Sequence, residues 1–327
     1  MLTQDDLRVA TLGPPRFTSP LQQRAGIMFV GPERRIRLHQ NLGPQVPADE
    51  LELSFEEAGP RREIFFDPPT TSAAIVTCGG LSPGLNNVIR AVVLELAHNY
   101  GVHRVLGIRD GYRGLNAEIG DPPVELTPEL VEDIDKLGGT VLGSSRGPQP
   151  PEVMVDFLER QRINLLFCVG GDGTQRGAHA VFQEITRRGL SISVVGIPKT
   201  IDNDIPYVSM TFGYVTALEQ AEAVLRGAHV EARSAVHGIA VVKLMGRDAG
   251  FIAAGAALAS DEANFVLIPE TDFPLEGIGG LLDLLEQRMR TRKHALVVVA
   301  EGAGQHLFAR QEMEKDASGN TQHRDIG

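Results

Sequence analysis

The segment of residues 168–174, CVGGDGT, has the composition of a phosphate-binding turn. It follows an apolar run at 165–167 and precedes a helix-like stretch at 175–188. Its glycines let the backbone approach a phosphate closely, and the start of the helix offers unpaired N–H groups and the positive end of the helix dipole. Asp172 would repel a polyphosphate unless a cation lay between them, so we interpret it as a Mg²⁺ ligand, direct or through water. The alternative is a tight strand-to-helix turn in which Asp172 caps the helix.

A second polar segment, PKTIDND, follows the apolar run at 192–197. Asp202 and Asp204 are two residues apart, so in extended chain they share a side and could serve as base and metal-shell carboxylates. For Asn203 and Asp204 an Asx-rich turn that caps the next helix is the alternative. For Asp202 the chemical role is favoured, because it lies at a strand end beside Lys199 and Thr200.

Two arginines and a tyrosine complete the candidates. Arg247 follows another apolar run in the glycine-flanked segment MGRDAG, where a guanidinium could neutralise a transferring phosphoryl group. The alternative is a surface arginine at a helix start, where the dipole disfavours its charge. Arg146, in GSSRG, allows a similar argument, and Tyr112 could stack on a base or pack. A glycine turn for polyphosphate, a Mg²⁺ carboxylate, a base and an arginine indicate phosphoryl transfer to a hydroxyl.

Composition excludes several other classes. The chain has 327 residues and a net charge of −11, a poor match to nucleic acid or an anionic membrane surface. No apolar run approaches the roughly 20 residues of a membrane helix, and the N-terminus does not resemble a signal peptide. Cys78 and Cys168 each lie in an apolar run, so we expect reduced core thiols and a cytoplasmic location, without a nucleic-acid or membrane partner.

The polar segments need a scaffold, and the hydrophobic pattern predicts one. Prolines punctuate residues 1–70, which we interpret as an extension packed on the main body, with a solvated, proline-rich arm as the alternative. Within it, the apolar runs at 27–30 and 36–38 could form a small hairpin. From residue 71 strand-like runs alternate with helical spacing, which predicts a parallel sheet covered on both faces. Strands are expected at 73–78, 105–108, 165–167, 192–197, 239–244, 265–268 and 295–300, and helices at 85–96, from 127, at 151–163 and at 212–227. Ligands bind at the carboxyl ends of such strands, where the polar segments fall.

Taken in order, these segments resemble the 6-phosphofructokinase family. The matching stretches are TCGGLSPGLNNVIRA, GIRDGYRGL, GGTVLGSSR, VGGDGTQRGA, PKTIDNDI, TFGYVTAL, KLMGRDAGFIA and VVVAEGAGQ. The resemblance implies an α/β fold of two Rossmann-like, doubly wound parallel-sheet domains. It places an N-terminal extension at 1–70, a nucleotide-binding domain at 71–212 and a sugar-phosphate-binding domain at 213–327. The extension is similar to that of the longer branch, typified by the plant and trypanosomatid ATP-dependent enzymes.

The resemblance also implies roles for single residues. Asp202 would be the base that takes the proton from the 1-hydroxyl of fructose 6-phosphate, and Asp172 would bind Mg²⁺. The nucleotide would be bound by Gly79, Tyr112, Arg146, Gly147, Gly171, Asp172, Gly173 and Thr174. The sugar phosphate would contact Thr200, Ile201, Asp202, Met245, Gly246, Arg247 and Glu301, with Thr200 and Arg247 also contributing to catalysis. Family members are usually homo-oligomers.

The phosphoryl donor depends on two positions. In this family a glycine at the position of Gly173 leaves room for the nucleotide, whereas pyrophosphate users tend to have aspartate there and lysine at the position of Lys199. The longer ATP-dependent branch combines glycine with lysine, as this chain does, so ATP is expected. A pyrophosphate-dependent enzyme is the alternative.

The chain departs from the family pattern at two places. Gly238 stands where the short bacterial enzymes place an arginine that reaches a neighbouring subunit, so that role is not transferred. The family continues with further strands and helices after the position of Gly327, so we expect the second half to be incomplete here. Two other hypotheses remain: a truncated, nucleotide-binding regulatory paralogue without turnover, and an NAD- or lipid-kinase-like protein, which leaves PKTIDND and MGRDAG unexplained.

Overall fold

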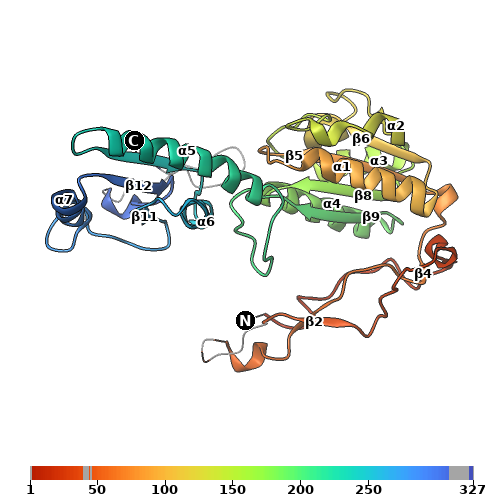
Figure 1. The fold of residues 1–327 in the computed structure, drawn as a ribbon. Coiled ribbons are helices and arrows are strands. Elements are labelled where there is room, and N and C mark those ends of the chain that lie inside the picture. The colour runs from red at the N-terminus through yellow and green to blue at the C-terminus, as the bar shows by residue number, and fades with distance from the viewer. Residues whose placement is uncertain (1, 40–43, 45, 309–323, 327) are drawn as a thin grey trace. The chain divides into compact units, whose positions relative to one another are not determined.

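The computed structural model describes residues 2–39, 44, 46–308 and 324–326 (Figure 1). Contacts divide the chain into two compact units. The first comprises residues 1–79, 85–170 and 174–197, and the second comprises 80–84, 171–173 and 198–327. The domain limits expected after residues 70 and 212 stay predictions.

The first unit is built on a five-stranded sheet in the order β7-β6-β5-β8-β9. The strands are β5 (Ser72–Cys78), β6 (Arg104–Ile108), β7 (Val124–Glu125), β8 (Leu165–Gly170) and β9 (Ser193–Pro198). β5 pairs in parallel with β6 and β8, and the short β7 pairs antiparallel with β6. The predicted strands are confirmed, and their carboxyl ends carry the glycine turns at 79 and 170.

Helices bury both faces of this sheet. They are α1 (Leu85–Leu94), which continues as a π-helical segment at Glu95–Tyr100, α2 (Pro128–Val131), α3 (Pro151–Arg160) and α4 (Asp172–Arg188). Leu158 of α3 and Val181 of α4 pack with Val76 and Cys168 in one core cluster. Ile75, whose side chain points to the other face, is also fully buried. Burial of both faces is the property expected of a parallel sheet.

The helix predicted at residue 127 forms with the expected cap. The Oγ1 atom of Thr127 accepts a hydrogen bond from the N–H of Leu130 at 3.2 Å, and Pro128 occupies the first helical position. Proline fits there because its missing N–H has no partner in the first turn of a helix.

The N-terminal segment pairs differently from the predicted hairpin. β2 (Arg35–Arg37) pairs with β3 (Ser54–Glu56), and β1 (Phe17–Thr18) pairs with β4 (Glu63–Ile64), both antiparallel. The prediction of a hairpin between 27–30 and 36–38 is therefore wrong. The N–H of Val30 instead donates to the carbonyl oxygen of Pro60 at 2.9 Å, so the partners lie about 20 to 45 residues further along the chain.

The second unit has a three-stranded parallel sheet in the order β10-β12-β11. Its strands are β10 (Ile239–Leu244), β11 (Phe265–Leu267) and β12 (Ala295–Ala300), and its helices are α5 (Tyr214–Ser234), α6 (Phe251–Ser260) and α7 (Leu281–Arg292) (Figure 1). Every residue of the central β12 is buried, whereas Val241 of the edge strand β10 is 65% exposed. The helix expected at 212–227 runs on to Ser234. No helix within the described ranges has the length and apolar character needed to span a membrane.

Both cysteines are free thiols in the core of the first unit, as predicted. Cys78 is 6% exposed and Cys168 is fully buried. Burial raises the pKa of each thiol to about 12, because the apolar surroundings disfavour the thiolate. Neither thiol is reactive in the native chain.

Gly177 in α4 gives a direct test of packing. A Cβ there would lie 2.4 Å from the Tyr112 ring, which is buried. Gly177→Ala is therefore expected to lower the free energy of unfolding by about 1–3 kcal/mol, although alanine is the better helix former. Urea unfolding measures the change.

The matched control is Gly227→Ala in α5, where an added Cβ meets no heavy atom within 4 Å. That substitution is expected to raise the free energy of unfolding by about 0.5–1 kcal/mol. Equal stabilisation by the two substitutions would contradict the close packing of Tyr112.

Candidate active site

The predicted phosphate turn joins β8 to α4. Gly170 ends the strand, and a Cβ on it would lie 2.2 Å from the Oγ1 of Thr174 and 2.6 Å from the carbonyl oxygen of Cys78. Asp172 and Gly173, both exposed, open the 17-residue α4, while Thr174 is buried. The turn thus presents a carboxylate and a glycine at the positive end of a long helix, as both interpretations of Asp172 require.

Tyr112 lies beneath this turn. Its hydroxyl donates to the carbonyl oxygen of Thr174 at 2.6 Å, and the ring is 5% exposed. Burial raises the pKa of the Tyr112 hydroxyl well above its usual value, so it stays a donor. This favours packing over base stacking, the two roles that the sequence left open.

Gly79 is brought to the turn that carries Arg146 and Gly147. The N–H of Gly79 donates to the carbonyl oxygen of Ser145 at 3.1 Å, and the hydroxyl of Ser144 donates to the carbonyl oxygen of Gly79 at 2.7 Å. Arg146 and Gly147 follow directly and are exposed. These three predicted nucleotide-binding residues therefore come together at one end of the first unit's sheet.

The loop after β9 belongs to the second unit and is organised by Asn203. Asn203 adopts a left-handed conformation with φ of 57°, its Oδ1 accepts from the N–H of Thr211 at 2.8 Å, and its Nδ2 donates to the carbonyl oxygen of Ser209 at 3.3 Å. The N–H of Asp202 donates to the Oγ1 of Thr200 at 3.1 Å. For Asn203 the turn role is thus what the contacts support, and the loop fixes the backbone on both sides of Asp202.

Asp202 has the electrostatics of a general base. Its pKa is raised to about 6, first by burial and then by the charges of Asp204 and Glu301, with the backbone N–H of Arg247 and the charge of Lys199 opposing the rise. Its Oδ1 atom is buried without a hydrogen-bond partner among the described residues. An unpaired carboxylate oxygen that titrates close to neutral pH suits a base that accepts a hydroxyl proton.

The turn after β10 places Arg247 and is locked to the turn after β12. The N–H of Gly302 donates to the carbonyl oxygen of Gly246 at 3.0 Å, and a Cβ on Gly302 would lie 1.6 Å from the carbonyl oxygen of Arg247. Arg247 is partly buried, with its Nε atom 3.5 Å from Asp248. Gly302 was not among the residues predicted from the sequence, although a glycine directly after the strand-end Glu301 was the available signal.

Asp172 and Asp202 belong to the same unit. Residues 171–173 group with the second unit, and a Cβ on Gly171 would lie 3.5 Å from the carbonyl oxygen of Lys199. Ile201 is partly buried and Met245 is 50% exposed. Arg247 and Glu301 both influence the pKa of the Asp202 carboxyl, so three of the predicted sugar-site residues are neighbours.

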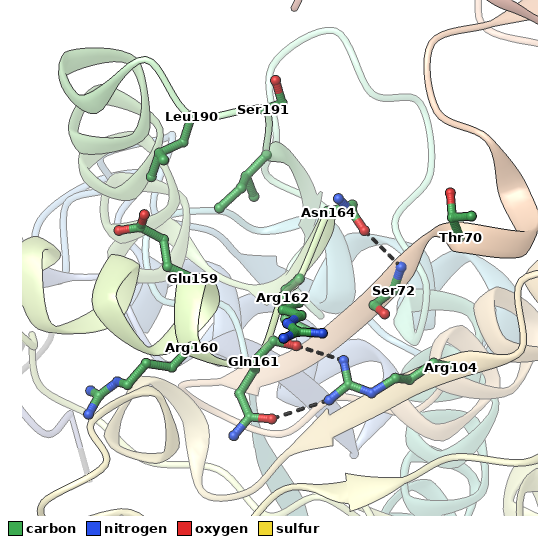
Figure 2. A pocket seen from close by; sticks show the side chains of 12 residues that line it. Thr70, Ser72, Arg104, Glu159, Arg160, Gln161, Arg162, Asn164, Leu190 and Ser191 are labelled. Carbon is green, nitrogen blue, oxygen red and sulfur yellow. Dashed lines mark hydrogen bonds between the residues drawn. The ribbon is translucent and has the colours of Figure 1, made fainter.

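A pocket of about 830 Å³ in the first unit contains none of these residues (Figure 2). It lies where the strands begin, lined among others by Ser72, Arg104, Gln161 and Asn164. The Arg104 guanidinium donates to the carbonyl oxygen of Gln161 at 2.7 Å, and the Asn164 side chain accepts from the N–H of Ser72 at 2.9 Å (Figure 2). Since ligands of doubly wound sheets bind at the carboxyl ends of the strands, this pocket is separate from the candidate site.

Comparison with known proteins agrees with the fold. The phosphofructokinase family model matches residues 72–326. The chain therefore belongs to the phosphofructokinase family.

Several relatives are similar over most of the chain. An ATP-dependent 6-phosphofructokinase of Borreliella burgdorferi is 46% identical over 98% of this chain and 74% of its own length. One of Trypanosoma brucei brucei is 44% identical over 100% of this chain and 67% of its own. Among solved structures, a pyrophosphate-dependent phosphofructokinase from Marinobacter aquaeolei has a TM-score of 0.63 at 25% identity, covering 71% of this chain and 61% of that chain.

Proposed function

We propose that this chain is an ATP-dependent 6-phosphofructokinase. It transfers a phosphoryl group from Mg-ATP to the 1-hydroxyl of fructose 6-phosphate, giving fructose 1,6-bisphosphate and ADP, a step of glycolysis. The observation that carries the proposal is the buried, unpaired Oδ1 of Asp202, in a chain whose family transfers phosphoryl groups to sugars.

Asp202 accepts the proton of the attacking hydroxyl. A general base works best when its pKa is close to the working pH, and the raised pKa of Asp202 approaches neutral pH. At neutral pH the Asp202 carboxylate is still largely ionised, so it can accept a proton. Thr200 holds the backbone of Asp202, and Ile201 lies between them in the substrate loop. Met245, Gly246, Arg247 and Glu301 contact the sugar phosphate, with Arg247 neutralising charge on the transferring group.

We assign binding of the phosphates to the turn at 170–174. Gly79, Arg146 and Gly147 of the first unit are also assigned to nucleotide binding. Asp172 fits a Mg²⁺ ion because it is an exposed carboxylate at the start of a helix. Magnesium is commonly bound through one or two carboxylates, waters and substrate phosphates instead of an all-protein cage. Asp172 would hold the ion, which would supply charge neutralisation for the phosphates.

The donor is assigned to ATP on two grounds. Gly173 adds no side chain at the start of α4, and the relatives at 44–50% identity are ATP-dependent by name. A pyrophosphate-dependent protein appears at 25% identity. Fructose 6-phosphate is the proposed acceptor. We propose a homo-oligomer as the assembly. The buried free thiols are compatible with a reducing cytoplasm, the location that we propose.

The direct test is phosphorylation of fructose 6-phosphate by the purified chain, with Mg-ATP and Mg-pyrophosphate in parallel and ATP binding titrated on the same sample. Turnover with ATP alone is expected. Turnover only with pyrophosphate would reverse the donor, and ATP binding without turnover on either donor would favour the regulatory alternative.

A further inference from the structure

Two histidines of the second unit lie with their ring nitrogens facing one another, and neither is among the candidate residues of the active site. His229 lies on α5 and His294 directly precedes β12. Their Nε2 atoms are 3.3 Å apart, the ring centres are 5.2 Å apart and the ring planes are inclined by 31°. The fold thus brings together two imidazoles that are 65 residues apart in the sequence.

The other nitrogen of each ring is occupied by an acceptor. The Nδ1 of His229 contacts Oε2 of Glu262, and the Nδ1 of His294 lies 3.0 Å from the carbonyl oxygen of Arg292. Carboxylate and carbonyl oxygens only accept, so both Nδ1 atoms carry the proton. In a neutral imidazole the remaining nitrogen then has a lone pair. Two lone pairs at this separation repel each other unless a proton or a metal ion lies between them.

The separation of the two nitrogens fits a metal ion. Zn–N bonds of about 2.0–2.1 Å in tetrahedral geometry place two nitrogens about 3.3 Å apart. The outer contacts also fit, because a metal-bound histidine commonly donates its second N–H to a carboxylate or a backbone carbonyl. Both kinds of outer partner are present here, one on each ring.

We propose that the Nε2 atoms of His229 and His294 form an open site for a divalent transition metal of the zinc type. Imidazole nitrogens favour such ions over Mg²⁺, so the site is chemically distinct from that of Asp172. In an open site of this kind, water would fill the remaining coordination positions of the ion. The side chains of His229 and Glu262 are 17% and 27% exposed, which leaves access for an ion.

Two protein ligands, where a structural zinc site has four, make this a weak, exchangeable site, and the neighbouring charges act in opposite directions. Glu262 supplies a negative charge beside His229. The Nε of Arg288 donates to the carbonyl oxygen of His294 at 3.0 Å, so a positive charge lies close to the second ligand. With two protein ligands, binding and release of the metal are expected to leave the fold intact.

Calorimetric titration of the full chain with Zn²⁺ at neutral pH, without nucleotide or Mg²⁺, tests the site. One Zn²⁺ per chain is expected, with Co²⁺ in its place giving the visible absorption of a nitrogen-bound ion. His229→Ala and His294→Ala are each expected to abolish binding. His103→Ala, which changes an exposed histidine of the first unit, is the matched control and should bind as the unchanged chain does.

Glu262→Gln keeps both ring ligands and changes only the outer contact. It is expected to weaken Zn²⁺ binding by about tenfold or more, and it stays informative if an alanine variant fails to fold. Absence of Zn²⁺ binding by the unchanged chain, or equal binding after loss of either histidine, would overturn the proposal. Because the readout is metal binding, it is independent of the kinase assay.

Discussion

Replacing Asp202 by asparagine is expected to lower kcat for phosphorylation of fructose 6-phosphate by about 10²–10⁴-fold, the usual contribution of a positioned general base. Binding of Mg-ATP should be nearly unchanged, because the roles proposed for the nucleotide lie on other residues. Steady-state kinetics and ATP titration on one preparation measure both quantities. A kcat that hardly moves would show that Asp202 is not the base.

The pH profile adds a second test of the same residue. The base acts as a carboxylate, and its pKa is raised to about 6, so kcat/KM is expected to fall as the pH drops below that value. Asp204→Asn is the matched control: it removes one of the charges that raise the pKa and should move the acid limb to lower pH while turnover persists at neutral pH.

The free energy of unfolding should fall as the pH rises, whereas kcat/KM should increase. The pKa of Asp202 in the folded chain, about 6, lies above the 3.8 of an unperturbed aspartate, so between these pH values the folded chain binds more protons than the unfolded chain. Its free energy of unfolding therefore decreases as the pH rises through this window. Asp202→Asn removes this penalty, and its Tm should exceed that of the unchanged chain above pH 6 but not near pH 4.

Replacing Gly173 by aspartate is expected to abolish ATP use. A second carboxylate beside Asp172 would occupy and repel the region where the nucleotide phosphates bind. The helix itself should tolerate the change, because Gly173 is exposed in the first turn of α4 and the dipole favours acidic residues there. A lost activity with an unchanged Tm would thus locate the effect in the donor site.

Gly173→Ala separates size from charge. A methyl group adds little bulk and no charge, so this control should retain part of the kcat/KM for ATP. Full ATP activity in the aspartate variant would remove the reason for assigning ATP over pyrophosphate, and the assay with Mg-pyrophosphate should be repeated on the same variant.

The sequence predicted the strands and the turns because each rests on local patterns. The apolar runs at 73–78 and 295–300 form fully or almost fully buried strands, and the Thr127-Pro128 cap needs only neighbouring residues. The hairpin failed because the pairing of Ile36 with Phe55 depends on a long connection whose length no local pattern encodes. Turn chemistry alone cannot select the partner of a short strand.

In the candidate site, too, local patterns predicted some features and missed others. Residue types and spacing selected Asp172, Asp202 and Arg247, but not the partners that tune them. The contact between Gly302 and the carbonyl oxygen of Arg247, and the influence of Glu301 on Asp202, join turns that are about 55 to 100 residues apart. The packing of Tyr112 under Thr174 also could not be predicted, because its hydrogen bond joins residues that are 62 positions apart in the sequence.

The two buried thiols can report local or global unfolding of the first unit, without an engineered probe. The whole sequence contains only Cys78 and Cys168, both in the first unit, and residues 198–327 contain no cysteine. A thiol reagent can label the chain only when this core becomes exposed to solvent, because burial suppresses the reactive thiolate. The rate of thiol labelling therefore measures unfolding of the first unit alone. Comparing the free energy of unfolding from labelling with that of the whole chain distinguishes the stability of the first unit from that of the second.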